Sequence, residues 1–139
     1  MNTKACQDAT SIFADKYEAG VLTQDCFAMV DDEGTLMCTL KAPAAPFLAC
    51  ETAIALAVAS ASSCAESTGP DGCMDSMVGD GSCSGSEDLC SVAYPGVGGV
   101  PVLNGDDCIG GIGIFGKSDL GNRTTVATDI AGQLALEYL

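Results

Sequence analysis

The chain has 139 residues with 19 acids and 5 bases, and its net charge of −14 makes nucleic-acid and membrane partners unexpected, because both carry negative charge. It contains no histidine, which excludes catalytic triads with an imidazole base and removes the commonest haem ligand. The length and the 47% hydrophobic content predict one domain that spans residues 1–139.

The first quarter of the sequence predicts a helix and a β-hairpin. Apolar side chains recur at helical spacing over about residues 4–18, so this segment is expected to be an amphipathic helix. The stretches "DCFAMV" and "TLMCTL" follow, joined by "DDEG", and predict two antiparallel strands. Leu36, Cys38 and Leu40 alternate onto one face of the second strand. The beginning of the chain lacks the apolar stretch of a secretory signal, so we expect a cytoplasmic location.

A second helix is predicted over "PAAPFLACETAIALAVASAS", which is apolar nearly all round. Its two prolines fall near the first turn, where a helix tolerates them. Glu51 and the many alanines make it too weakly hydrophobic for a membrane span. A helix without a polar face must be buried on several sides. We therefore expect the sheet to cover one side and a second subunit another, which predicts a homo-oligomer.

Glycine, serine and acids dominate the next segment, which predicts a loop insertion at about residues 66–90. Its apolar content is too low to hold it in place, and one disulfide closing a loop of this size would stabilise the fold by about 3 kcal/mol. We therefore predict at least one bridge within the set Cys64, Cys73, Cys83 and Cys90. Free thiols in a reducing compartment and metal ligation are the alternatives. The other five cysteines lie in apolar runs and are expected to be free core side chains: Cys6, Cys26, Cys38, Cys50 and Cys108.

The last third predicts a second hairpin and a final helix. An Asn-Gly turn joins "GGVPVL" to "CIGGIGIFG", and apolar rows at helical spacing predict a helix over about residues 123–138. Gly110, Gly111 and Gly113 leave one face of the hairpin without bulk. Either a helix or a flat ligand can approach such a face closely.

Residues 111–118, "GIGIFGKS", match the phosphate-binding pattern G-x-x-x-x-G-K-S. Large apolar residues alternate with glycine between its ends, which is typical of a strand. Only 21 residues follow, too few for the remaining strands of a nucleotide-binding enzyme. We therefore interpret the stretch as a β-strand.

The glycine-proline pattern resembles the core motif of the GlcG/HbpS-like haem-binding family, which also occurs fused to corrinoid adenosyltransferases. The matching positions are Gly98, Gly99, Pro101, Val102, Gly105, Ile109, Gly110, Ile112, Gly113, Ile114 and Gly116. The resemblance implies an α+β fold like that of profilin, an antiparallel sheet flanked by helices in the order α-β-β-α-(loop)-β-β-β-α. A lysine near Glu51 and an acid near Arg123, both expected from the family, are missing here.

The same resemblance implies a small-molecule binding module for haem or a related tetrapyrrole, without catalytic machinery of its own. Because histidine is absent, haem iron would need sulfur or phenolate ligation. Candidate ligands near the motif are Met37, Cys90 and Tyr94, of which Tyr94 is favoured. The motif residues Gly98, Gly99 and Pro101 are assigned to the ligand site with them.

Two other functions stay open at this point. The apolar second helix favours a non-enzymatic assembly protein, and the cysteines of the insertion favour a thiol-redox protein. An enzyme is the less favoured alternative, because nothing fixes the geometry of Lys41 or Lys117 relative to Asp31 or Asp32.

Overall fold

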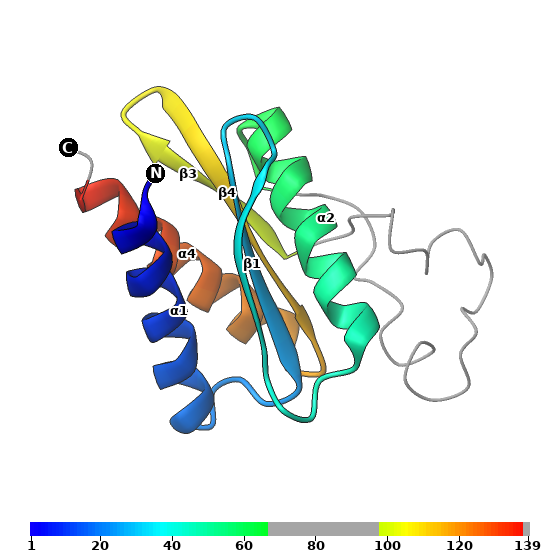
Figure 1. Cartoon of the computed structure of the whole chain (residues 1–139). Helices are drawn as coiled ribbons and strands as arrows, with labels where there is room; N and C mark the ends of the chain where they lie inside the picture. Colours follow the sequence, from blue (N-terminus) through cyan, green and yellow to red (C-terminus); the bar gives the residue numbers. More distant parts are fainter. Residues whose placement is uncertain (67–97, 138–139) are drawn as a thin grey trace, which may run out of the picture.

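The computed structural model describes residues 1–66 and 98–137, and three helices and four strands lie in these ranges (Figure 1). In chain order they are α1 (Thr3–Glu18), β1 (Asp25–Asp31), β2 (Leu36–Lys41), α2 (Phe47–Ser63), β3 (Gly99–Asn104), β4 (Asp107–Gly116) and α4 (Leu120–Glu137). The predicted α+β class is confirmed. Of the three strands predicted between the insertion and the last helix, the described residues contain β3 and β4. Most of the predicted insertion lies outside the described residues.

The four strands form one antiparallel sheet in the order β2-β1-β4-β3. Both predicted hairpins are confirmed, and Gly105 adopts a left-handed φ of 65° at the tip of the second one. The pairing of β1 with β2 shifts register between Met29 and Val30, so that Cys38 lies opposite Met29 and Leu36 opposite Val30. Because of this shift, the predicted alternation of Leu36, Cys38 and Leu40 onto one face is wrong at Leu36.

Helices cover both faces of the sheet (Figure 1). On the face of α1 and α4, the largest buried cluster collects Phe13, Phe27, Met29, Ile112, Ile114, Ile130 and Leu134. On the face of α2, a second buried cluster contains Cys26, Ala28, Ala49, Ala53, Leu56 and Phe115. Side chains of the two clusters alternate along β1 and β4, as expected for strands that are buried on both faces.

Polar contacts fix how α1 begins and how it sits against α4. The side chain of Asn2 accepts a hydrogen bond from the backbone N–H of Ala5, at 3.1 Å, and so caps the first turn. The ammonium of Lys4 lies 3.0 Å from the carboxylate of Asp8 and 3.2 Å from that of Glu137 at the end of α4. These exposed ion pairs are expected to contribute orientation more than stability.

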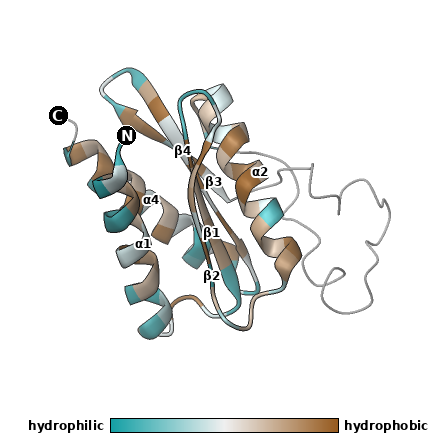
Figure 2. Cartoon of the chain, in the orientation of Figure 1, coloured by the Kyte–Doolittle hydropathy of each residue, from teal (hydrophilic) through white to brown (hydrophobic). Residues whose placement is uncertain are grey.

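Helix α2 is apolar on nearly every side, as predicted, and the sheet covers one of those sides. Ala49, Ala53, Leu56 and Ala57 are fully buried against the strands. Phe47 keeps 72% of its surface exposed and Leu48 keeps 41%. Figure 2 shows the apolar colour along much of the helix. None of the helices in the described ranges is long and apolar enough to cross a membrane.

Candidate functional site

The glycine-proline motif lies at the start of β3, directly beneath α2. A Cβ atom built on Gly99 would stand 2.5 Å from the carbonyl oxygen of Leu56 and 2.7 Å from the hydroxyl of Ser60. Gly98 has a φ of 123°, which side chains rarely adopt, and its Cβ would meet the carbonyl oxygen of Ile114 at 3.1 Å. The motif therefore lets the helix backbone approach the sheet.

The neighbouring strand continues the same surface. On β4, a Cβ on Gly111 would overlap the carbonyl oxygen of Ala57, and one on Gly113 would overlap that of Ala53. Of the two alternatives left open by the sequence, close helix packing is the one that the structure shows at these two glycines. A ligand contact of Gly98, Gly99 or Pro101 stays a prediction.

The stretch that matches the phosphate-binding pattern is a strand, as predicted, and a carboxylate closes its far end. Residues up to Gly116 belong to β4, and Ile112 and Ile114 are fully buried. The hydroxyl of Ser118 donates a hydrogen bond to the buried carboxylate of Asp25, which also accepts the Ser118 backbone N–H at 3.2 Å. A phosphate placed here would meet a carboxylate, and the two negative groups would repel one another.

Of the three candidate iron ligands, the described part of the chain places Met37. It lies on β2, the edge strand, at the register shift described above. Its side chain is half-buried and packs against the cluster under α1 and α4. Leu36, 44% exposed, and Leu40, 36% exposed, flank it along the strand. Cys90 and Tyr94 lie outside the described residues.

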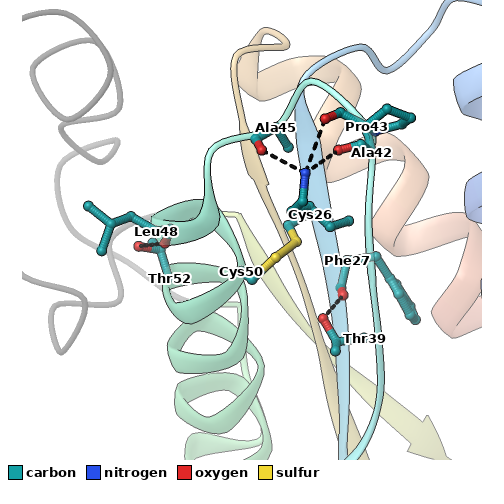
Figure 3. Close-up of a disulfide and its surroundings, with 10 residues drawn as sticks. Cys26, Phe27, Thr39, Ala42, Pro43, Ala45, Leu48, Cys50 and Thr52 are labelled. Carbon is teal, nitrogen blue, oxygen red and sulfur yellow. Dashed lines mark hydrogen bonds between the residues drawn. A yellow bond between two sulfur atoms is a disulfide. The ribbon is translucent and has the colours of Figure 1, made fainter.

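The lysine and acid considered for an enzyme stand apart on the first hairpin. The Lys41 ammonium donates to the carbonyl oxygens of Ala42, Pro43 and Ala45, at 3.0, 3.2 and 2.9 Å. Figure 3 labels these three acceptor residues. The Asp31 carboxylate accepts from the backbone of Glu33 and Thr35 in the β1–β2 turn, at 2.9 Å each. Since Lys41 pairs with the start of β1 and Asp31 ends that strand, the two occupy opposite ends of the hairpin.

A disulfide joins the sheet to α2 on this side of the molecule. Cys26 of β1 is bonded to Cys50 in α2, with a Cα–Cα distance of 5.1 Å (Figure 3). The prediction that both are free core thiols is wrong. Both lie in apolar runs, as read from the sequence, but Cys26 points to the face that α2 covers, and Cys50 meets it there.

The other cysteines in the described residues are free thiols and lie in two pairs. Burial, and after it a hydrogen bond with Cys6, raises the pKa of Cys38 to about 12. Burial, and after it a hydrogen bond with Cys64, also raises the pKa of Cys108. Cys64 belongs to the set predicted to hold a bridge, and its thiol is free here. The remaining members of that set, Cys73, Cys83 and Cys90, lie outside the described residues.

The described residues line open hollows on the surface, two of which lie beside α1. One, of about 420 Å³, lies between α1 and α4 and is lined by Lys4, Asp8 and Glu137 among others. The second, also about 420 Å³, is lined by Glu18, Thr23 and others around the end of α1. Both hollows are open to solvent and have polar side chains in their linings, whereas pockets that bury a small ligand are concave and mostly hydrophobic. The described residues also contain no cluster of three or more acids and thiols that could hold a metal ion.

Arg123 is a buried basic residue at the sheet-facing side of α4. It is 2% exposed in α4, and its guanidinium lies 5.1 Å from the centre of the Phe115 ring. A cation over an aromatic face gains an electrostatic attraction. The residue thus connects α4 to the end of β4.

Comparison with known proteins shows which solved structures share this fold. No protein-family model and no curated protein matches the sequence. Several solved structures match it along nearly the whole chain. The Klebsiella pneumoniae protein ORFY, of family DUF336, has 18% identity and a TM-score of 0.71, over 100% of this chain and 92% of that one. A double mutant of Streptomyces reticuli HbpS has 19% identity and a TM-score of 0.68, over 96% and 86%. The chain has the fold of HbpS.

A third structure of the same fold contains a ligand. PduOC, solved as a complex with haem, has 18% identity and a TM-score of 0.69, over 95% of this chain and 93% of that one. The predicted resemblance to GlcG/HbpS-like proteins is therefore confirmed in the fold, including the order of the elements around the glycine-proline motif.

Proposed function

We propose that this chain is a small-molecule binding module whose ligand is haem or a related planar tetrapyrrole. The observation that carries the proposal is the fold shared, over 95% of the chain, with a protein solved as a haem complex. HbpS, which has the same fold, supports it. The proposal includes no catalytic step.

The available ligand atoms decide how iron could be held. Without histidine, the choices are a phenolate, a thioether or a thiolate. We propose Tyr94 as the iron ligand, with Met37 and Cys90 as the other candidates. Met37 is the candidate that the described residues place, half-buried on the edge strand β2 with the exposed Leu40 on the same strand. Cys38 suits the role of iron ligand less, because its pKa of about 12 keeps the free thiol protonated.

Haem taken up by the chain would supply the redox chemistry of its iron, and the protein would supply the axial ligand and the surrounding surface. Gly98, Gly99 and Pro101 follow Tyr94 closely in the sequence. We propose, as the family resemblance implies, that they contribute contacts to the ligand.

An absorbance titration with haemin tests this proposal. The wild-type chain is expected to give a saturable Soret band with one haemin per chain. Tyr94→Phe should weaken binding about tenfold or more and shift the band, and Tyr17→Phe, a tyrosine on α1, is the matched control. Met37→Leu, with the fully buried Met29→Leu as control, tests the thioether. Absence of a saturable band would contradict the proposal, and an unchanged band in both ligand variants would contradict the assigned ligands.

We also propose that the chain forms a homodimer or larger assembly through the outer face of α2. The face is defined here as Phe47, Leu48, Ile54 and Val58, which are apolar and keep part of their surface exposed. An exposed apolar surface of this kind is usually an interaction site. An assembly protein without a ligand is the second candidate function, and this face is the observation that favours it.

Light scattering at tens of micromolar protein tests the assembly. The wild type is expected to have at least a dimer mass, and Phe47→Glu is expected to lower it towards the monomer. Phe47 is 72% exposed, so the substitution should leave the fold intact. Gln133→Glu adds the same charge to an exposed position of α4 and should change nothing. A monomer mass for the wild type would contradict the assembly.

The cytoplasmic location stays a proposal, and the Cys26–Cys50 disulfide bears on it. Stable disulfides are rare in reducing compartments. Acid-quenched cells, alkylated before lysis, would show whether Cys26 and Cys50 are oxidised in place. Two alkylated thiols at these positions are expected in the cytoplasm, and an intact bridge would contradict that location.

A further inference from the structure

The last turn of α2 carries an unusual cysteine. Cys64 caps the helix in the left-handed conformation, with a φ of 55°, and is the one non-glycine residue with a positive φ in the described ranges. Glycine is the usual residue there, because it adopts this conformation without steric cost. With cysteine in its place, the thiol comes within 3.8 Å of the carbonyl oxygen of Ala61, one turn back.

A second thiol approaches the same oxygen from the sheet. Cys108, near the start of β4, lies 3.5 Å from the carbonyl oxygen of Ala61 and 3.5 Å from that of Gly110. Two thiols that are far apart in the sequence therefore share one acceptor atom. Burial, and after it the neighbouring Cys64 thiol, raises the pKa of Cys108.

Exposure separates this pair from the other free pair. Cys64 is exposed and Cys108 is half-buried, whereas Cys6 and Cys38 are both half-buried against the core. Thiol–disulfide exchange begins with attack by an accessible thiolate. The Cys64–Cys108 pair has an accessible first thiol with a second thiol beside it, and the Cys6–Cys38 pair lacks the exposed member.

We propose that Cys64 and Cys108 are a reversible redox pair that is oxidised by a low-molecular-weight disulfide of the glutathione type. The Cys64 thiolate attacks one sulfur of that disulfide, forms a mixed disulfide and releases one small thiol. The Cys108 thiolate then attacks the Cys64 sulfur and releases the second small thiol. The protein loses two electrons and two protons in total, and the small disulfide gains them as two thiols.

The bond would fasten the end of α2 to β4. It would close the loop between positions 64 and 108 in the unfolded chain, which lowers the entropy of that state. For a loop of this size in a chain of this length, the thermal midpoint is expected to rise by about 10 °C on oxidation.

The experiment equilibrates the full-length, haem-free chain with oxidised and reduced glutathione, blocks remaining thiols and digests with proteases that cut at Glu and Asp. Residues 52–66 then carry Cys64 alone, and residues 107–118 carry Cys108 alone. The expected product is a disulfide between these two peptides, lost on reduction. Cys108→Ser should instead hold Cys64 as a mixed disulfide with glutathione, and Cys38→Ser should leave the linked peptides unchanged.

A variant with serine at Cys73, Cys83 and Cys90 separates this pair from the cysteines predicted earlier to bridge. The 64–108 bond is expected to form in it as in the wild type. The proposal is overturned if the wild type keeps a mixed disulfide at Cys64, if Cys64 links to Cys73, Cys83 or Cys90 instead, or if both peptides stay alkylated. Because haem takes no part in the measurement, its outcome is independent of the haem titration.

Discussion

The packing of α2 on β4 makes a sharp prediction for Gly113→Ala. The added Cβ would overlap the carbonyl oxygen of Ala53 and stand 2.9 Å from both the backbone nitrogen of Ala57 and the Cβ of Leu56. Two of these atoms belong to the helix backbone, which cannot rotate away as a side chain can. The helix must therefore move off the strand or the strand must bend.

The magnitude follows from two opposing effects. Overpacking of a close-packed core costs about 1–3 kcal/mol, and contact with rigid backbone puts this site near 3 kcal/mol. Replacing glycine by alanine also stiffens the unfolded chain, which returns up to about 1 kcal/mol. We expect Gly113→Ala to lower the free energy of unfolding by about 2 kcal/mol and the thermal midpoint by about 7 °C.

Urea and thermal unfolding followed by circular dichroism provide the measurement. Gly132→Ala, on α4, is the matched control, because a Cβ atom at this position would have no neighbour within 4 Å. That substitution should raise the free energy of unfolding by about 1 kcal/mol, since alanine favours a helix. If Gly113→Ala is as stable as the wild type, the close approach of α2 to β4 is refuted.

Three further predictions concern the bridge, the serine at the strand end and the buried thiol. Replacing both Cys26 and Cys50 by alanine removes a bridge with a sequence separation of 24, so the free energy of unfolding should fall by about 3 kcal/mol in urea; an unchanged midpoint would speak against the bridge. The wild type should give no magnesium-dependent thermal shift with ATP, because the Ser118 hydroxyl already donates to Asp25, and a clear shift would reverse the interpretation of residues 111–118. The stabilisation from protonated Cys38 is complete below its ordinary pKa of 9.0 and is lost as the pH rises towards about 12, because the unfolded chain ionises first. Cys38→Ser should therefore reduce the loss of stability measured between pH 9 and 11, and an identical slope in both proteins would count against the raised pKa.

Local patterns in the sequence were enough for most of the fold. Periodicity predicted the first and last helices, a long alanine-rich apolar run predicted the second, and the turn residues predicted both hairpins, because these signals depend on neighbours within a few positions. The strand at residues 111–118 followed from alternating isoleucine and glycine. The same patterns could not predict what covers the glycines, since a strand face without side chains can pack against either a helix or a ligand. In the structure, the backbone of α2 at Ala53 and Ala57 lies against them.

The pairing of distant residues accounts for what the sequence left undetermined. Apolar runs around Cys26 and Cys50 predicted burial correctly, but burial alone does not say that a strand face and a helix face bring two sulfurs together. The register shift at Met29 could not be seen either, and it sets where Leu36 and Met37 lie. Asp25 stands at the start of an apolar strand. This unusual position for an acid was the sequence signal that its carboxylate is buried and hydrogen-bonded.

The central claim, that the folded chain binds haem specifically, is tested most directly by thermal unfolding at increasing haemin concentration. A ligand that binds the folded state alone stabilises it, by about 2.7 kcal/mol at a hundredfold excess over the dissociation constant. The account predicts a midpoint that rises with haemin, by about 9 °C at that excess. Haemin that merely adsorbs to apolar surface also binds the unfolded chain, so a midpoint that stays constant or falls would contradict the claim.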